Sequence, residues 1–223
     1  MDNSTPEKAK EYDSKIEKTI PFYSEFYKHT IDLVKSLPVK QGKWLDTGCG
    51  TGEFVLLAAK EFSEFQFSLC DPSEAMLTEA QQKLTCQQQI TNFCICGSQQ
   101  LNFADEFVIV TAIQAHHYME YKNRLIALEN CYNALKNDGV FIFFENFAPN
   151  SEYTKNIVLD RWGRYQKHQG KTDAQVADHI ARYGKNYFPI TINEHFELLK
   201  KNNFRYMEIF WLSYMQVGIY AVK

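Results

Sequence analysis

The residues best suited to chemistry lie in a short glycine-rich stretch and at an aspartate that follows it. Gly48, Gly50 and Gly52 alternate with other residues behind Asp46 in WLDTGCGTGEF. Glycine destabilises the interior of a helix or strand, so this density of glycines indicates a loop whose backbone bends sharply or touches a ligand. Asp71 follows the loop at the spacing of a ribose-binding acid, roughly 20 residues further along. The pattern predicts a site for a ribose and an adjoining polar group.

The flanking residues predict the elements that must position this site. Residues 43–46 read as a strand leaving a turn, and residues 53–62 repeat apolar side chains at helical spacing. The glycines therefore sit at a strand-to-helix turn, where unpaired N–H groups can meet a ligand. A buried strand over residues 66–70 brings Asp71 to its carboxyl end, and residues 72–77 open another helix. Two consecutive strand–loop–helix units thus present the glycine loop beside the acid.

Nicotinamide dinucleotides are also bound by a glycine-rich turn and a ribose-binding acid, so they are the alternative ligands. Their G-x-G-x-x-G fingerprint would require glycine at position 53, where this chain has Glu53. The loop instead reads D-x-G-x-G-x-G, followed by CDPSEAML at the second strand and ICGSQQLNF after the third. FVIVTAIQAHHYM covers a fourth strand and its exit.

With these motifs the chain resembles the class I S-adenosylmethionine-dependent methyltransferases over nearly its whole length. The resemblance implies S-adenosylmethionine (SAM) as cofactor and S-adenosylhomocysteine (SAH) as product. It places Asp71 on the ribose, Met76 beside the adenine and residues 111–113 near the methionine end. Ser98 stands where that family often has aspartate, which alters the expected hydrogen bond to the adenine. The cofactor residues that it implies in the core are Asp46, Gly48, Cys49, Gly50, Gly52, Asp71, Pro72, Met76, Gly97, Ser98, Gln99, Thr111, Ala112 and Ile113.

The resemblance also implies an α/β fold with a Rossmann-like, seven-stranded, mostly parallel sheet and helices on both faces. We expect a helix ending at Gly139, a fifth strand over 140–147, a helix over 192–204 and a C-terminal antiparallel hairpin over 205–223. The predicted division is an N-terminal helical cap (1–37), a cofactor-binding core (38–147), a helical lid insertion (148–190) and a segment that completes the sheet (191–223).

Substrate specificity is expected in the two segments outside the sheet. In the first, Thr5, Pro6 and Glu7 favour a helix start, and Pro21 separates two helices. By resemblance, Tyr12 and Tyr23 close over the cofactor; ordinary packing is the alternative for both. In the second, a connection of this length inside a compact domain is usually functional. Its substrate candidates are Arg161, Trp162, Arg182 and Tyr187, and a solvated helix face is the alternative for any single arginine.

The chemistry expected is in-line methyl transfer, because the sulfonium methyl is already electrophilic and the protein mainly aligns and desolvates the nucleophile. His116, at the exit of the fourth strand, is the candidate base, with packing as the alternative. Glu145 and Asn146 end the fifth strand and are candidate substrate contacts. The sequence holds no His/Cys/Asp/Glu cluster with metal-ligand spacing, so no metal is expected.

The composition of the chain argues against nucleic acid and membranes as binding partners. The net charge of −3 gives no basic footprint for nucleic acid, and no apolar run reaches the roughly 20 residues that span a bilayer. The six cysteines form no C-x-x-C pair and are interpreted as reduced core thiols of a cytoplasmic protein. The leading hypothesis is an enzyme that methylates a small molecule. The alternatives are an RNA methyltransferase and a noncatalytic or variant-cofactor binder of the same fold.

Overall fold

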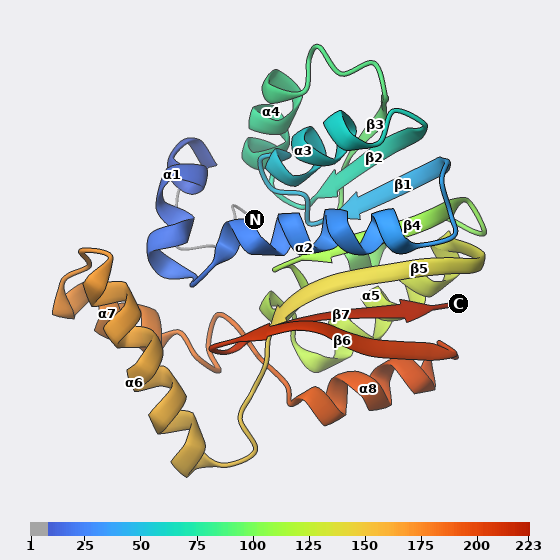
Figure 1. Cartoon of the computed structure of the whole chain (residues 1–223). Helices are drawn as coiled ribbons and strands as arrows, with labels where there is room; N and C mark the ends of the chain where they lie inside the picture. Colours follow the sequence, from blue (N-terminus) through green and yellow to red (C-terminus); the bar gives the residue numbers. More distant parts are fainter. Residues whose placement is uncertain (1–8) are drawn as a thin grey trace.

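A computed structural model describes residues 9–223 and contains a seven-stranded sheet (Figure 1). The strand order is β3-β2-β1-β4-β5-β7-β6. The strands β3, β2, β1, β4 and β5 pair in parallel, whereas β7 runs antiparallel to both of its neighbours, β5 and β6. The strands are β1 (Gly42–Thr47), β2 (Phe65–Asp71), β3 (Ile90–Ile95), β4 (Phe107–Ile113), β5 (Leu135–Asn146), β6 (Tyr206–Ser213) and β7 (Gln216–Val222). The predicted fold class, including the C-terminal hairpin, is confirmed.

Helices cover both faces of this sheet because the central strands are apolar on both sides. Trp44 and Leu45 are neighbours on β1, and each is fully buried in a different hydrophobic cluster. The face of Trp44 carries α2 (Tyr23–Ser36), α3 (Glu53–Glu61) and α4 (Glu74–Lys83). The opposite face carries α5 (Tyr121–Ala134) and α8 (Ile192–Lys201).

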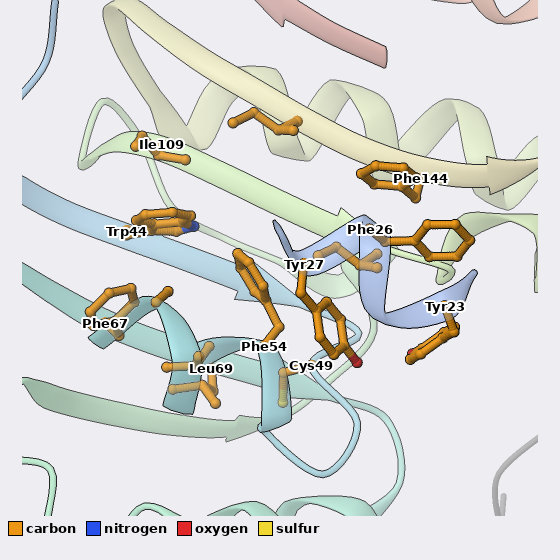
Figure 2. Packing of buried hydrophobic residues seen from close by; sticks show 14 of the residues in the cluster. Tyr23, Phe26, Tyr27, Trp44, Cys49, Phe54, Phe67, Leu69, Ile109 and Phe144 are labelled. Atoms are coloured by element: carbon orange, nitrogen blue, oxygen red, sulfur yellow. The ribbon is translucent and has the colours of Figure 1, made fainter. Parts of the chain in front are cut away.

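The cap consists of α1 (Ala9–Thr19) and α2, which separate at Pro21 as expected. The predicted helix start at Thr5, Pro6 and Glu7 lies outside the described residues. Figure 2 shows Tyr23, Phe26 and Tyr27 of α2 packed over the sheet, with Phe54 of α3 beside Tyr27. The ring of Phe26 stacks on Phe144 of β5, with 4.6 Å between the ring centroids. This aromatic packing fixes α2 across the carboxyl half of the sheet.

The insertion after β5 is helical and contacts the cap. It contains α6 (Glu152–His168) and α7 (Asp173–Ala181), which project beyond the sheet (Figure 1). The buried indole of Trp162 donates a hydrogen bond of 2.6 Å to the carbonyl of Thr19, at the end of α1. Tyr165 donates its hydroxyl to the carbonyl of Glu17 at 2.7 Å. The two segments outside the sheet therefore support one another.

Two expectations from the sequence are wrong. The helix expected to end at Gly139 ends at Ala134, because buried Leu135 already pairs with Phe107 of β4 and starts β5. Gly139 therefore lies inside β5, in the bulged stretch between Leu135 and Val140. The cysteines are all free, but they are not all core residues, since Cys86 is exposed and Cys94 and Cys96 are half-buried.

The Trp162 contact predicts how the cap depends on the lid. In Trp162→Phe the hydrogen bond to Thr19 is lost while most of the packing remains. We expect the lost hydrogen bond to lower the free energy of unfolding by only about 1 kcal/mol, because Gln166 still donates to the carbonyl of Thr19. Hydrogen exchange should show faster exchange in α1 than in the wild type. The matched control is Tyr153→Phe, on the exposed side of α6; unchanged exchange of α1 in Trp162→Phe would contradict the assignment.

Candidate active site

A cavity of about 660 Å³ opens at the carboxyl ends of β1, β2 and β4. In a doubly wound sheet this edge is where ligands bind. Most of the residues proposed for the cofactor line this cavity, namely Tyr12, Tyr23, Asp46, Gly48, Cys49, Gly50, Asp71, Pro72, Met76, Gly97, Ser98, Gln99 and Ile113. Gly52, Thr111 and Ala112 are not among its lining residues. The motifs that are separate in sequence thus meet around one space.

Gly48 and Gly50 of the glycine loop both line the cavity, but they have different roles. Gly48 and Gly50 have φ angles of +69° and +54°, a region that other residues rarely adopt. A Cβ on Gly48 would come within 2.5 Å of the Cβ of Ala115, so this glycine allows the loop to touch the exit of β4. A Cβ on Gly50 would meet no protein atom within 4 Å. Gly50 therefore offers bare backbone to the cavity.

Asp71 ends β2 and is bound to two segments that surround it. Its Oδ2 accepts a hydrogen bond from the N–H of Gly50 at 2.9 Å, and its Oδ1 accepts one from the N–H of Ser73 at 2.8 Å. Burial raises the pKa of this carboxyl, and the two N–H donors partly offset the effect. Each carboxylate oxygen has more than one lone pair, so both can also accept ribose hydroxyls.

Asp46 ends β1 and lies at the end of a buried chain of hydrogen bonds. The indole of Trp44 donates to the hydroxyl of Thr111 at 3.0 Å, and this hydroxyl donates to Oδ1 of Asp46 at 2.6 Å. Burial raises the pKa of Asp46 to about 7, although the Thr111 hydrogen bond lowers it and Asp71 raises it. Thr111 therefore supports Asp46 from below, whereas Asp46 itself faces the cavity.

Three tyrosines of the cap form the roof of the cavity. The hydroxyls of Tyr12 and Tyr23 lie 3.2 Å apart, and Tyr27 stands one turn beyond Tyr23 on the same face of α2. Burial raises the pKa of all three phenols, which keeps them neutral hydrogen-bonding groups. Sequence analysis missed Tyr27, although its i+4 spacing from Tyr23 is the signal that would have found it.

A polar cluster fastens this roof to the glycine loop. The hydroxyl of Thr51 donates to Oδ1 of Asp13 at 2.7 Å. Lys83 of α4 contacts Oδ2 of Asp13 at 2.6 Å and Glu53 at 2.7 Å. Asp13 is the neighbour of Tyr12, so the cluster sets where α1 meets the cavity.

The side of the cavity predicted to hold the adenine is built from α4 and the segment after β3. Met76 is buried near the start of α4, where its N–H donates to the capping hydroxyl of Ser73 at 3.3 Å. The hydroxyl of Ser98 is turned away from an adenine edge, because it bonds Thr47 at 2.8 Å and the ring of His116 at 2.9 Å. Gln99 keeps a buried carbonyl oxygen that has no hydrogen-bond partner in the described part of the chain.

The residues proposed for catalysis and substrate contact lie behind or beside the cavity and do not line it. His116 is buried against Ser98, and burial lowers the pKa of its ring to about 4, so the ring is neutral at pH 7. Glu145 accepts the N–H of His116 at 2.8 Å and lies 3.4 Å from the ring of His117. Although burial alone would raise it, the neighbouring histidines and Arg124 lower the pKa of Glu145 to about 2.

The other candidates have structural partners. Asn146 accepts a hydrogen bond from Gln216 at 3.0 Å, and Arg161 lies 4.0 Å above the ring of Tyr214. Tyr187 is buried with its ring edge-on to Tyr183, next to Arg182 in the turn after α7.

Sequence analysis also missed the residues that line the outer part of the cavity. They come from the exit of β4 and the end of the lid, and they are Gln114, Ala115, Tyr118, Met119, Glu120, Asn123, Lys185, Asn186 and Phe188. The backbone N–H of Phe188 donates to the carbonyl of His117 at 2.6 Å, which joins the two groups. Gln114, Ala115, Tyr118 and Met119 lie within the motif FVIVTAIQAHHYM, but only the tertiary fold places them beside the end of the lid.

Comparison with known proteins agrees with this geometry. A family model described as a methyltransferase domain matches residues 45–139. A carboxy-S-adenosyl-L-methionine synthase of Nautilia profundicola is 26% identical over 203 residues, covering 91% of this chain and 86% of that protein. Relatives of the same name from other bacteria are similarly distant.

Solved structures share the fold. A SAM-dependent methyltransferase of Leishmania major superposes with a TM-score of 0.66 at 15% identity, covering 90% of this chain and 72% of that one. A phosphoethanolamine N-methyltransferase of Haemonchus contortus, solved with SAH, gives 0.62 at 19% identity over 90% of this chain and 42% of that one.

The open space at Gly50 predicts a selective loss of binding. In Gly50→Ala the new methyl group points into the cavity, so we expect the affinity for SAH to fall by about tenfold or more. The matched control is Gly170→Ala in the α6–α7 turn, which also has a positive φ of +88° and open space around it. Titration calorimetry on both variants decides the matter. Equal affinities would mean that Gly50 does not meet the cofactor.

The raised pKa of Asp46 predicts pH-dependent binding. Near pH 7 a large share of the free protein carries this carboxyl protonated, and the cationic sulfonium and ammonium groups of SAM favour the ionised form. We expect SAM binding to release a proton and to weaken as pH falls below about 7. Calorimetry in buffers of different ionisation enthalpy measures that proton. In Asp46→Asn the proton release should disappear.

The same group predicts a stability effect of defined sign. Its folded pKa lies above its ordinary value of 3.8, so the folded state binds more protons than the unfolded state between these two values. The wild type without ligand should therefore lose stability relative to Asp46→Asn as pH rises from about 4 to 7. Melting curves at several pH values test this; a difference that grows in the opposite direction would contradict it.

Proposed function

We propose that the chain is a class I SAM-dependent methyltransferase that transfers the methyl group to a small organic acceptor held beneath the lid. The observation that carries the proposal is the continuity of the cavity. Its inner part is lined by the motifs that resemble SAM-binding ones, and its outer part is lined by Gln114, Ala115, Tyr118, Met119, Glu120, Asn123, Lys185, Asn186 and Phe188. A volume of about 660 Å³ lies within the roughly 300–1,000 Å³ of pockets that hold small organic ligands.

For the transfer itself, the protein mainly has to align the acceptor with the methyl group of SAM. A lone pair of the acceptor attacks the methyl carbon, and the C–S bond breaks with its electron pair going to sulfur, which gives SAH. The tyrosine roof and the lid exclude water, so the acceptor is desolvated as it is aligned. Burial raises the pKa of Tyr118 to about 12, so its phenol stays protonated and is available as a hydrogen-bond donor in the outer part.

We propose that the acceptor needs no strong base from the protein. The ring of His116 lies behind Ser98, and Glu145 is held by the histidines, so neither faces the acceptor. This arrangement supports an acceptor that is nucleophilic by itself, such as a carboxylate, an unprotonated amine or an activated carbon.

The surroundings of the cavity support a metabolite and not RNA. The chain is acidic overall, with a net charge of −3. Among the described residues that line the cavity, Lys185 alone has a cationic side chain.

No helix within residues 9–223 is long and apolar enough to cross a membrane. Free thiols at all six cysteines are consistent with the cytoplasmic location that the sequence predicts.

A second candidate function is modification of SAM itself. It is favoured by the relatives named carboxy-S-adenosyl-L-methionine synthases, which match this chain over most of its length. Such a reaction would place a carboxyl group near the sulfonium centre, and Lys185 at the cavity wall supplies a positive charge for it. In that step the sulfonium methyl group would lose one proton to solvent and form a C–C bond to the carbon of CO2, released from a carboxylate donor. The product would then be a SAM derivative that keeps its sulfonium.

Mass spectrometry of the products separates the two functions. The enzyme is incubated with methyl-labelled SAM and a protein-free metabolite extract. With the label on the methyl carbon, methyl transfer predicts SAH together with a labelled acceptor, whereas the second function predicts a cofactor heavier than SAM by the mass of CO2 and still labelled. Formation of neither product, with SAM bound, would contradict both.

Two variants sharpen this assay. Lys185→Ala should abolish the carboxylated product if that product is the real one, since its carboxylate would lose the cation. Lys201→Ala, on the exposed end of α8, is the matched control and should behave as wild type. If the carboxylated product is made but Lys185→Ala leaves its yield unchanged, Lys185 has no role in binding it.

A further inference from the structure

Gln114 is the most unusual residue of the cavity. It follows β4 directly and has a φ of +57°, a backbone conformation that residues other than glycine rarely adopt. Its N–H donates to the carbonyl of Phe144 at 2.8 Å, so the sheet holds the strained backbone in place. Strain of this kind persists where the surrounding structure imposes it, and it gathers at functional sites.

The side chain of Gln114 is buried without a partner. Only 5% of the residue is exposed, and it lines the cavity. Neither its amide nitrogen nor its amide oxygen has a hydrogen-bond partner within the described residues. A buried amide that lacks both partners destabilises the free protein. Gln114 therefore offers a ligand in the cavity both an unpaired donor and an unpaired acceptor.

The strand order indicates which part of the cofactor lies there. Asp71, Met76 and Gly97 belong to β2 and to the segments on the β3 side, where the ribose and adenine are expected. Along the carboxyl edge β1 follows β2, and β4 follows β1. A cofactor whose ribose lies at Asp71 and whose adenine points toward β3 must extend its methionine tail toward β1 and β4.

The contact between the glycine loop and the β4 exit agrees with this direction. A Cβ on Gly48 would lie 2.5 Å from the Cβ of Ala115, so residues 114 and 115 stand against the first glycine of the loop. Asp46 lies at the same end, below that glycine, and also lines the cavity. Gln114 and Asp46 thus flank the end of the cavity opposite the adenine side.

We propose that the amide of Gln114 binds the methionine tail of SAM, with Nε2 donating to the tail carboxylate and Oε1 accepting from the tail ammonium. A neutral amide offers one group of each kind, which matches the two charges of an amino acid. The inference deepens the proposed function, because it rests on SAM as the cofactor. It holds whether a methyl group or another group is transferred.

The test compares two ligands that differ only in the tail. SAH carries the amino-acid tail, and 5′-methylthioadenosine carries the same adenosine and sulfur without it. In Gln114→Leu we expect the affinity for SAH to fall roughly ten- to hundredfold, as for a lost hydrogen bond to a charged group. The affinity for methylthioadenosine should change by less than about twofold. Titration calorimetry on the whole protein measures both.

The matched control is Gln99→Leu. Gln99 also lines the cavity and has an unpartnered amide oxygen, but it lies on the adenine side. Its replacement should therefore alter the affinities for the two ligands by the same factor. A loss confined to SAH in Gln114→Leu and shared in Gln99→Leu supports the proposal.

Two results would overturn it: an unchanged SAH affinity in Gln114→Leu, or an equal loss for SAH and methylthioadenosine. If Gln114→Leu does not fold, Gln114→Asn is read in the same way, since asparagine tolerates the left-handed backbone and its shorter amide cannot reach as far. These binding measurements need no acceptor, so their failure is distinct from a failure of the product assay.

Discussion

The carboxylate of Asp71 holds the cofactor site together before any ligand is present. Its hydrogen bonds to the N–H groups of Gly50 and Ser73 join the glycine loop and the start of α4 to the end of β2. The carbonyl of Cys70, one residue earlier, accepts the N–H groups of Gly48 and Cys49 at 2.7 and 3.0 Å. The same stretch of β2 therefore fixes the loop and presents the acid that we propose for the ribose, so the two cannot move independently. A site preorganised in this way loses little freedom when a ligand binds.

The cover of the site depends on weaker and more exposed contacts. Asp13, Thr51 and Lys83 connect α1 to the loop, but Asp13 has 43% of its side chain exposed, so solvent screening reduces the strength of this ion pair. The contact of α1 with the lid is more protected, because Trp162 is buried where it meets Thr19. We infer that the cap opens more readily from the glycine loop than from the lid. Such an opening would admit SAM without disturbing the sheet.

The sequence contained most of the fold and half of the site. Local patterns placed the strands and helices within a few residues, because each is apolar with a clear period and ends at a turn. The predicted helix end at Gly139 was wrong because Leu135 pairs with Phe107 of β4 and so ends the helix earlier. This is a long-range contact that the local pattern does not contain. The glycine loop and Asp71 are contiguous motifs and could be recognised. Tyr118 and Lys185 meet at the cavity through the packing of the lid on the β4 exit, which no local pattern encodes. Gln114 directly follows β4, but its left-handed backbone and its unpartnered amide are not visible in the sequence.

The orientation of the cofactor across the edge of the sheet decides which residues bind its two ends. A crystal structure of the protein with SAH measures that orientation directly. We expect the ribose hydroxyls on Asp71, the adenine beside Met76 and the amino-acid tail at Asp46 and Gln114. A tail directed toward β3, or SAH bound outside this cavity, would contradict the account.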